Sequence, residues 1–402
     1  MSSLSSKAIG DLKSLLDVAT SDKDTGLPCV GAVVVGNGRH WATELFEQVD
    51  DKADFYWLAS CTKLVTSIAC LQLVEKGVLA LDDADQVERL CPELKDIRVV
   101  NRDGALEDKE GRITLRMLLT HTAGFGYSFM NLSLAKYREG QTPFDEMSGS
   151  MEDMLQPLVN QPGRTFEYGI SLDWAGILLE RATGQKLSEY MRESIFEPLG
   201  IEEMTMFPSK DLQARVAGLW NRGEDGVVRP GPLHLDKWFN ATSPDDAFNS
   251  GGAGLCGTLR DFSKILVTLL NNGTSPTTNK KILKPSTVDD LFTNQLPDQP
   301  DFARRPLPTC KPWVTSAAPE LYPFCPPSKP QGWGLGVMLS PSITGRSDTA
   351  AHWFGVSNLF WWCDREKGVA GIVGSQILPF SDPQVVELWA QVESKVYEDV
   401  SK

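Results

Sequence analysis

Strand-like sequence lies near both ends of this 402-residue chain, and the sequence between is mostly helix-like. The β-branched runs 28–35 and 369–373 are typical of buried strands, whereas 172–183 and 187–196 fit helices. Strands from the two ends can share a sheet only if the middle of the chain is an insertion. We therefore expect an α+β fold, an α/β sandwich in which an antiparallel sheet is flanked by helices, with a mostly helical insertion domain.

We place the discontinuous sheet domain at residues 1–80 and 245–402, and the insertion domain at 81–244. A functional site is expected in the cleft between two such parts. Residues 297–332 hold ten of the chain's 25 prolines and several aromatic residues, a composition too apolar for a disordered linker. We interpret this segment as a packed loop over the cleft, and an inert surface loop is the alternative.

Shorter patterns predict further elements. The run 64–74 fits a helix, and Gly77 is a suitable stop for it. The other expected helices are 7–18, 115–119, 151–159 and 383–396, and the other expected strands are 41–48, 55–58, 334–339 and 358–363.

The net charge of −14 argues against a nucleic-acid partner, because an acidic surface repels phosphate backbones. No stretch approaches the roughly 18 apolar residues that a membrane span needs, and the N-terminus lacks the apolar core of a secretory signal. The eight cysteines form no Cys-x-x-Cys pair and no zinc-ligand spacing with histidine. We therefore expect free thiols, no metal, no cofactor and a cytoplasmic protein.

The run Ser60-Cys61-Thr62-Lys63 stands where strand-like sequence passes into a helix. Side chains at i and i+3 of a helix face the same way, so Lys63 can reach the Ser60 hydroxyl. A lysine activates a serine only when it is neutral, which requires burial or nearby positive charge. The alternative is that Ser60 is an N-cap serine followed by a solvated lysine.

A second copy of this pattern occurs at Ser133-Leu134-Ala135-Lys136. No strand-like sequence precedes it, and it follows the loop-like run 124–126. We interpret the second copy as a chance match. The glycine-rich run 251–254 lacks the Lys-Ser/Thr of a phosphate-binding loop and predicts a tight turn near the cleft.

Several motifs occur together with the Ser60 pattern. They are the runs 118–124 (LLTHTAG), 162–168 (PGRTFEY), 198–201 (PLGI), 251–254 (GGAG) and 333–336 (WGLG). In this order and spacing the chain, over residues 27–376, resembles the class C β-lactamase and penicillin-binding-protein-like serine hydrolase superfamily. The resemblance implies a serine nucleophile that forms an acyl-enzyme.

The resemblance assigns roles to particular residues. Ser60 matches the nucleophile, Lys63 its activating lysine, and Tyr168 the tyrosine that relays the proton to and from the leaving group. The third family motif is matched by 352–355, so Gly355 with Ser60 would supply the two N–H groups of the oxyanion hole. The alternatives are Tyr168 as a plain packed aromatic and His352 as a core or capping histidine. We assign His352 no acid–base role.

Two departures from the family pattern bear on the substrate. Ile170 stands where β-lactamases and penicillin-binding proteins carry an asparagine two residues after the tyrosine. His352 replaces the lysine of the third motif, and Phe354 displaces its glycine. These changes argue against β-lactamase or D,D-peptidase activity as the main role.

The runs 168–176 and 361–368 are similar to fungal secondary-metabolite acyltransferases of the statin-pathway transesterase type, in the branch that also holds the family VIII esterases. That resemblance implies an acyl group taken from a thioester, such as the acyl carrier domain of a polyketide synthase. The acceptor would be a hydroxyl of a bulky small molecule, and the kinetics would be ping-pong.

Two other functions remain open from the sequence. A carboxylesterase would use the same acyl-enzyme and resolve it with water, and a non-enzymatic binding protein would keep only the scaffold. Tyr127 matches a family position near the substrate and Trp353 adjoins Phe354 and Gly355, so both are expected to bind substrate. The alternative for each is an ordinary core aromatic residue.

Overall fold

The computed structural model describes residues 4–38, 44–48, 53–140, 146–231, 235–318, 320–322 and 324–400. Its main feature is an antiparallel sheet of seven strands, in the order β10-β11-β12-β13-β14-β1-β2. The strands are β1 (Val30–Gly36), β2 (Glu44–Gln48), β10 (Gly332–Trp333), β11 (Met338–Leu339), β12 (Ala351–Gly355), β13 (Leu359–Asp364) and β14 (Val369–Gly374). Strands from the two ends of the chain share one sheet, so the expected α+β architecture is confirmed.

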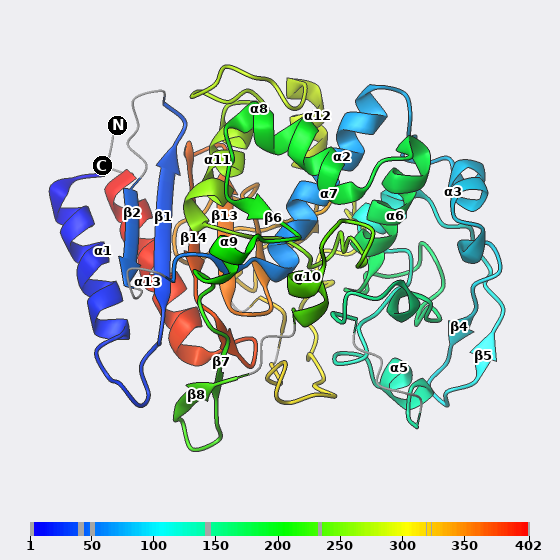
Figure 1. The fold of residues 1–402 in the computed structure, drawn as a ribbon, viewed down its shortest axis with the longest axis horizontal. Helices are drawn as coiled ribbons and strands as arrows, with labels where there is room; N and C mark the ends of the chain where they lie inside the picture. The colour runs from blue at the N-terminus through cyan, green and yellow to red at the C-terminus, as the bar shows by residue number, and fades with distance from the viewer. Residues whose placement is uncertain are drawn as a thin grey trace.

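Helices cover both faces of this sheet (Figure 1). The rings of Phe360 and Trp361, neighbours in β13, point to opposite faces because strand side chains alternate. Phe360 stacks on Trp389 of α13 (Pro383–Val400), 4.4 Å between ring centroids, and Trp361 packs near Phe262 of α11 (Leu259–Leu270). The outer helix α1 (Ser6–Ala19) contacts α13 and β2. Burial on both faces explains why these strands are continuously apolar.

The helix α2 (Thr62–Glu75) is buried on all sides, from Thr62 through Leu73. It lies between the sheet and α6 (Ser171–Thr183) in Figure 1, and it contacts α6 and α7 (Leu187–Met191). The helix ends at Glu75, Lys76 caps it, and Gly77 has a positive φ of 69°. The expected helix and its stop are therefore confirmed.

Short strands tie the middle of the chain to its ends. Strand β9 (Cys256–Gly257) pairs with β3 (Tyr56–Trp57) and with β6 (Met204–Thr205). Strand β7 (Trp220–Arg222) pairs with β8 (Val228–Pro230) and with β15 (Ile377–Leu378). The stretch 204–230 thus pairs with β9 and β15 of the C-terminal part and forms a single bridge to Phe55 of the N-terminal part. The domain boundaries at 80 and 244 stay predictions.

The remaining α-helices and strands are short. They are α3 (Ala84–Leu90), β4 (Val99–Val100), β5 (Leu106–Glu107), α4 (Leu115–Leu119), α5 (Leu132–Tyr137), α8 (Glu197–Leu199), α9 (Lys210–Gln213), α10 (Asp236–Asn240) and α12 (Pro285–Leu291). Among the described residues, no helix is long and apolar enough to cross a membrane.

Two expected elements are wrong in detail. The run 334–339 is not one strand, because the chain reverses at Gly336 with a φ of +97° and β10 pairs with β11. The run 151–159 forms only the 3-10 turn Met151–Met154, since Pro157 disfavours helical backbone at the residue before it. Of the expected strand 41–48, residues 44–48 form β2, and 41–43 lie outside the described residues.

Candidate active site

Ser60 lies in a 3-10 turn, Ala59–Cys61, that leads directly into α2. The preceding Ala59 has a φ of +44°, which costs free energy for a residue with a side chain and marks a constrained turn. The end of β12 packs against this turn: a Cβ atom on Gly355 would lie 2.7 Å from the Leu58 carbonyl oxygen. Only glycine lets the strand approach so closely.

The side chain of Lys63 lies at the centre of the site and is 1% exposed. Its Nζ atom donates to the Ser60 hydroxyl at 3.0 Å, to the Tyr127 hydroxyl at 3.0 Å and to the Gly252 carbonyl at 2.9 Å. Three acceptors match the three protons of an ammonium group. Lys63 is therefore neither solvated nor ion-paired through these contacts.

Burial lowers the pKa of Lys63 to about 8, although Asp173 nearby raises it. The charged form loses its water shell and gains only neutral acceptors in direct contact. A lysine with this pKa gives up a proton near neutral pH. Its lone pair then faces the Ser60 hydroxyl, which is the geometry that a general base requires.

Tyr168 completes the cluster, with its ring below Lys63. The Lys63 Nζ atom lies 4.9 Å from the centroid of the Tyr168 ring, and the indole N–H of Trp353 donates to the Tyr168 hydroxyl at 3.2 Å. The His121 ring packs at 4.9 Å from the Tyr168 ring, centroid to centroid. Burial raises the pKa of Tyr168 above its ordinary value, while hydrogen bonds with Ser60 and Trp353 lower it. The resting Tyr168 is therefore a neutral phenol.

The hydroxyl bonded to Lys63 is that of Tyr127, not that of Tyr168. Burial raises the pKa of Tyr127 well above its ordinary value, so it too is a neutral phenol. Tyr127 also lines the small cavity at Ser60. The structure thus adds a contact with the lysine to the substrate-binding role predicted for Tyr127.

Sequence reasoning missed the role of Asp173 in α6. Its Oδ1 atom accepts hydrogen bonds from the Ser250 hydroxyl at 2.6 Å and the Gly252 N–H at 2.9 Å. These bonds orient the Gly252 carbonyl toward Lys63, and the neighbouring Gly251 carbonyl accepts from Thr66 of α2. The run 251–254 is thus the expected tight turn, and hydrogen bonds from Lys63 and Thr66 hold it against α2. The only sequence signal was the position of Asp173 five residues after Tyr168.

The predicted oxyanion-hole residues come together at one place. Ser60 lies on the 3-10 turn and Gly355 ends the strand that packs against it. Trp353 is 1% exposed and lies behind Tyr168, so the structure gives it a positioning contact. The substrate contact expected of Trp353 stays a prediction.

His352 does not join the cluster. Its Nε2 atom shares a 2.9 Å hydrogen bond with Ser340, and its ring packs on Tyr322 and near Trp389 of α13. Burial, and then the nearby Arg346, lowers the pKa of His352 well below its ordinary value. It is a neutral core histidine, in line with the absence of an acid–base role.

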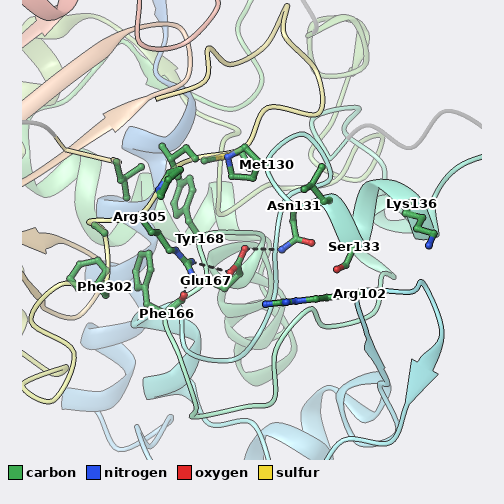
Figure 2. Close-up of a pocket in the computed structure, with 16 residues that line it drawn as sticks. Arg102, Met130, Asn131, Ser133, Lys136, Phe166, Glu167, Tyr168, Phe302 and Arg305 are labelled. Atoms are coloured by element: carbon green, nitrogen blue, oxygen red, sulfur yellow. Dashed lines mark hydrogen bonds and ion pairs between the residues drawn. The ribbon is translucent and has the colours of Figure 1, made fainter. Parts of the chain in front are cut away.

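The second Ser-x-x-Lys pattern is not a comparable site. Lys136 is exposed, and Figure 2 shows its side chain directed away from Ser133. Ser133 and Lys136 both lie in the short helix α5 and line a cavity. The contrast with the buried Lys63 supports the interpretation as a chance match.

Two cavities adjoin the cluster. The larger, drawn in Figure 2, has a volume of about 730 Å³ and reaches Tyr168. Its walls come from Arg102, from residues 130–133 and 136, from 166–168 and, in the proline-rich segment, from 302–303, 305–308 and 321. The smaller cavity lies at Ser60 and measures about 20 Å³. Part of the proline-rich segment therefore borders the site, whereas Tyr322 packs under α13 and Trp313 is 62% exposed.

The eight cysteines are all unpaired thiols, as expected. Burial raises the pKa of Cys61, which lies beside Ser60, although Lys63 lowers it. A thiol in this environment stays protonated and is a poor nucleophile. Within the described residues, no group of three or more His, Cys, Asp or Glu side chains is arranged to hold a metal ion.

Known proteins similar to this chain have closely related names. A family model described as beta-lactamase matches residues 17–309. Lovastatin esterase of Penicillium rubens is 34% identical, over 88% of this chain and 87% of that protein. The ML-236A carboxylate methylbutanoyltransferase mlcH of Penicillium citrinum is 32% identical, over 85% of this chain and 80% of that protein.

Solved structures agree with these relatives. A LovD6 mutant of simvastatin synthase from Aspergillus terreus superposes with a TM-score of 0.79 at 26% identity, covering 98% of this chain and 96% of that one. EstCE1, a hydrolase with promiscuous acyltransferase activity, superposes with a TM-score of 0.72 at 18% identity, covering 97% and 99% of the two chains. The second likeness concerns the fold alone.

Proposed function

This chain belongs to the beta-lactamase family, and we propose that its Ser60 takes an acyl group from a thioester and passes it to a hydroxyl of a bulky secondary metabolite. The chain is an enzyme of the serine acyltransferase type, like the methylbutanoyltransferases among its relatives. One observation carries the assignment of the nucleophile: the buried Nζ atom of Lys63, with its pKa lowered to about 8, lies 3.0 Å from the Ser60 hydroxyl.

The first half-reaction forms the acyl-enzyme. Neutral Lys63 accepts the Ser60 proton while the Ser60 oxygen attacks the thioester carbonyl carbon. The N–H groups of Ser60 and Gly355 hold the oxygen of the tetrahedral intermediate. Tyr168 gives a proton to the departing thiolate and regains one from Lys63. A thiol leaves, and the acyl group remains as an ester of Ser60.

The second half-reaction transfers the acyl group. The acceptor occupies the 730 Å³ cavity, whose wall includes Tyr168. The acceptor hydroxyl gives its proton to the Tyr168–Lys63 pair as it attacks the acyl carbon, and the Ser60 oxygen takes a proton back. A new ester is released. We further propose that the acyl donor is carried on a polyketide synthase carrier domain. We also propose a cytoplasmic location, which the unpaired cysteine thiols support.

The intact mass of the protein, after incubation with a butanoyl thioester, tests this proposal. We expect an added mass of one acyl group in the wild type and in Ser133→Ala, and none in Ser60→Ala. Ser133→Ala is the matched control because it removes the same hydroxyl from the other Ser-x-x-Lys pattern. An adduct that persists in Ser60→Ala would show that another residue is the nucleophile.

A carboxylesterase is the second candidate, because lovastatin esterase is among the named relatives. The two functions differ only in what removes the acyl group from Ser60. If an added alcohol such as a fused-ring sterol-like diol speeds the loss of the adduct and appears as its ester, transfer dominates. If the adduct decays at the same rate with and without acceptors, hydrolysis dominates.

β-Lactamase activity and a purely binding role find less support. Ile170 is fully buried at the N-terminus of α6 and presents no amide to a lactam side chain. A binding protein would have no need of a lysine buried without a carboxylate in direct contact, which costs free energy.

A further inference from the structure

We infer that Met130 separates an acyl chamber at Ser60 from the acceptor cavity and sets the length of acyl chain that the enzyme accepts. The inference rests on the proposed function, because it concerns the acyl group carried by Ser60. It assigns a specificity-determining role to a residue outside the predicted site.

The chamber at Ser60 is small and mostly apolar, with a volume of about 20 Å³. This is room on the order of one or two carbon groups. Its walls include Ser60, Tyr127, Met130, Tyr168 and Phe354. In the absence of rearrangement, an acyl group longer than this must pass one of these walls.

Met130 and Tyr168 are the two residues that this chamber shares with the 730 Å³ cavity, among the described residues. Tyr168 is needed for proton transfer and is held by Trp353 and His121, so it is not free to move. Met130 also lines a third small cavity of about 10 Å³ beside Leu307 and Phe380. Met130 thus lines three cavities, and Figure 2 shows it at the wall of the large one.

The backbone of Met130 is held in place relative to the catalytic cluster. Its N–H donates to the Tyr127 carbonyl at 3.0 Å, and the Tyr127 hydroxyl accepts from Lys63. In the same turn, Ser128 binds the carboxylate of Glu146 through its N–H and its hydroxyl. The Phe129 carbonyl accepts from the Cys310 N–H of the proline-rich segment at 2.9 Å. The main chain of residues 127–130 is thus held both by Glu146 and by the proline-rich segment.

The side chain of Met130 is only partly buried. Methionine is unbranched with three rotatable bonds, so it adapts to the shape of a neighbour. With a short acyl group on Ser60, Met130 closes the chamber from the acceptor cavity. A longer acyl chain must displace Met130 into the space that the acceptor needs, which disfavours long chains both in acylation and in transfer.

The test compares thioesters of one thiol that carry acetyl, butanoyl, hexanoyl or octanoyl groups. Thiol release gives kcat/KM for acylation, and intact mass identifies the adduct. In the wild type we expect octanoyl to react about tenfold more slowly than acetyl, because a hydrophobic pocket discriminates by about this factor. Met130→Ala should raise the octanoyl-to-acetyl ratio about tenfold, since it joins the chamber to the cavity.

Three further variants make the result specific. Met151→Ala removes the same side chain, also partly buried, from the 3-10 turn Met151–Met154 and should leave the ratio unchanged. Met130→Leu, of similar volume, should keep the wild-type preference. Met130→Val, which shortens the side chain less than alanine does, should shift the preference toward longer chains by a smaller factor and serves if Met130→Ala does not fold.

The inference is overturned if the wild type accepts octanoyl as readily as acetyl. It is also overturned if both Met130→Ala and Met130→Val change the rate equally at every chain length, as a merely structural role would. Failure of the proposed function looks different, because Ser60 would then carry no acyl adduct from any donor.

Discussion

Lys63 donates a hydrogen bond to the hydroxyl of Tyr127 across 3.0 Å, whereas the family resemblance matches Tyr168 to the tyrosine that relays the proton. Tyr168 instead places its ring beneath the Nζ atom and its hydroxyl against Trp353. Two neutral phenols therefore surround one buried amine. This arrangement separates the residue that orients the lysine from the residue proposed to move the proton of the leaving group.

Replacing either tyrosine by phenylalanine should separate these roles. Tyr127→Phe removes one of three acceptors of Lys63, and we expect acylation to slow about tenfold with an unchanged set of products. Tyr168→Phe removes the proposed proton relay, and acylation should fall about 10²–10⁴-fold. Thiol-release kinetics measure both. If Tyr127→Phe is the more damaging variant, Tyr127 is the relay and our assignment of Tyr168 is wrong.

The pH dependence of acylation should report on Lys63. Burial lowers its pKa from 10.5 to about 8, and only the neutral amine accepts a proton from Ser60. The rate is therefore expected to rise from pH 6 to pH 9 and to level off above the pKa. Lys63→Arg keeps the charge at every pH and should be inactive throughout. A wild-type rate that is flat between pH 6 and pH 9 would contradict this role.

Gly252→Ala should damage both stability and acylation. The added Cβ atom would lie 2.2 Å from the Asp173 carboxylate, which must move and would take the Gly252 carbonyl away from Lys63. We expect a loss of about 1–3 kcal/mol in the free energy of unfolding, as in other overpacked cores. The matched control is Gly10→Ala in α1, where no atom lies within 4 Å of the new Cβ and stability should rise by about 0.5–1 kcal/mol. Chemical denaturation measures both changes.

Trp353→Phe tests the positioning of Tyr168. The substitution keeps an aromatic ring on β12 but removes the N–H that binds the Tyr168 hydroxyl. Acylation should slow about tenfold through kcat, with little change in KM, because the substrate loses no direct contact. If KM rises and kcat stays constant, Trp353 binds substrate directly, as the sequence had suggested.

The sequence determined the fold class and the pairing of Ser60 with Lys63. Strand-like runs at both ends require an insertion between them, and burial on both faces demands the continuous apolar character of β1, β13 and β14. The spacing from Ser60 to Lys63 fixes their contact within one turn of helix. The local pattern alone was misleading where a single residue interrupts an element: Gly336 reverses the expected strand, and Pro157 ends the expected helix.

What only the tertiary structure decided is which groups surround Lys63. Two of its three acceptors lie 64 and 189 positions away in sequence, and Met130 lines the same cavity as Ser60 although a separate turn carries it. The two Ser-x-x-Lys patterns have the same local spacing, yet one lysine is buried with a lowered pKa and the other is exposed. Burial is a property of packing between distant segments, so no local pattern encodes it, and burial is what makes Lys63 able to accept a proton.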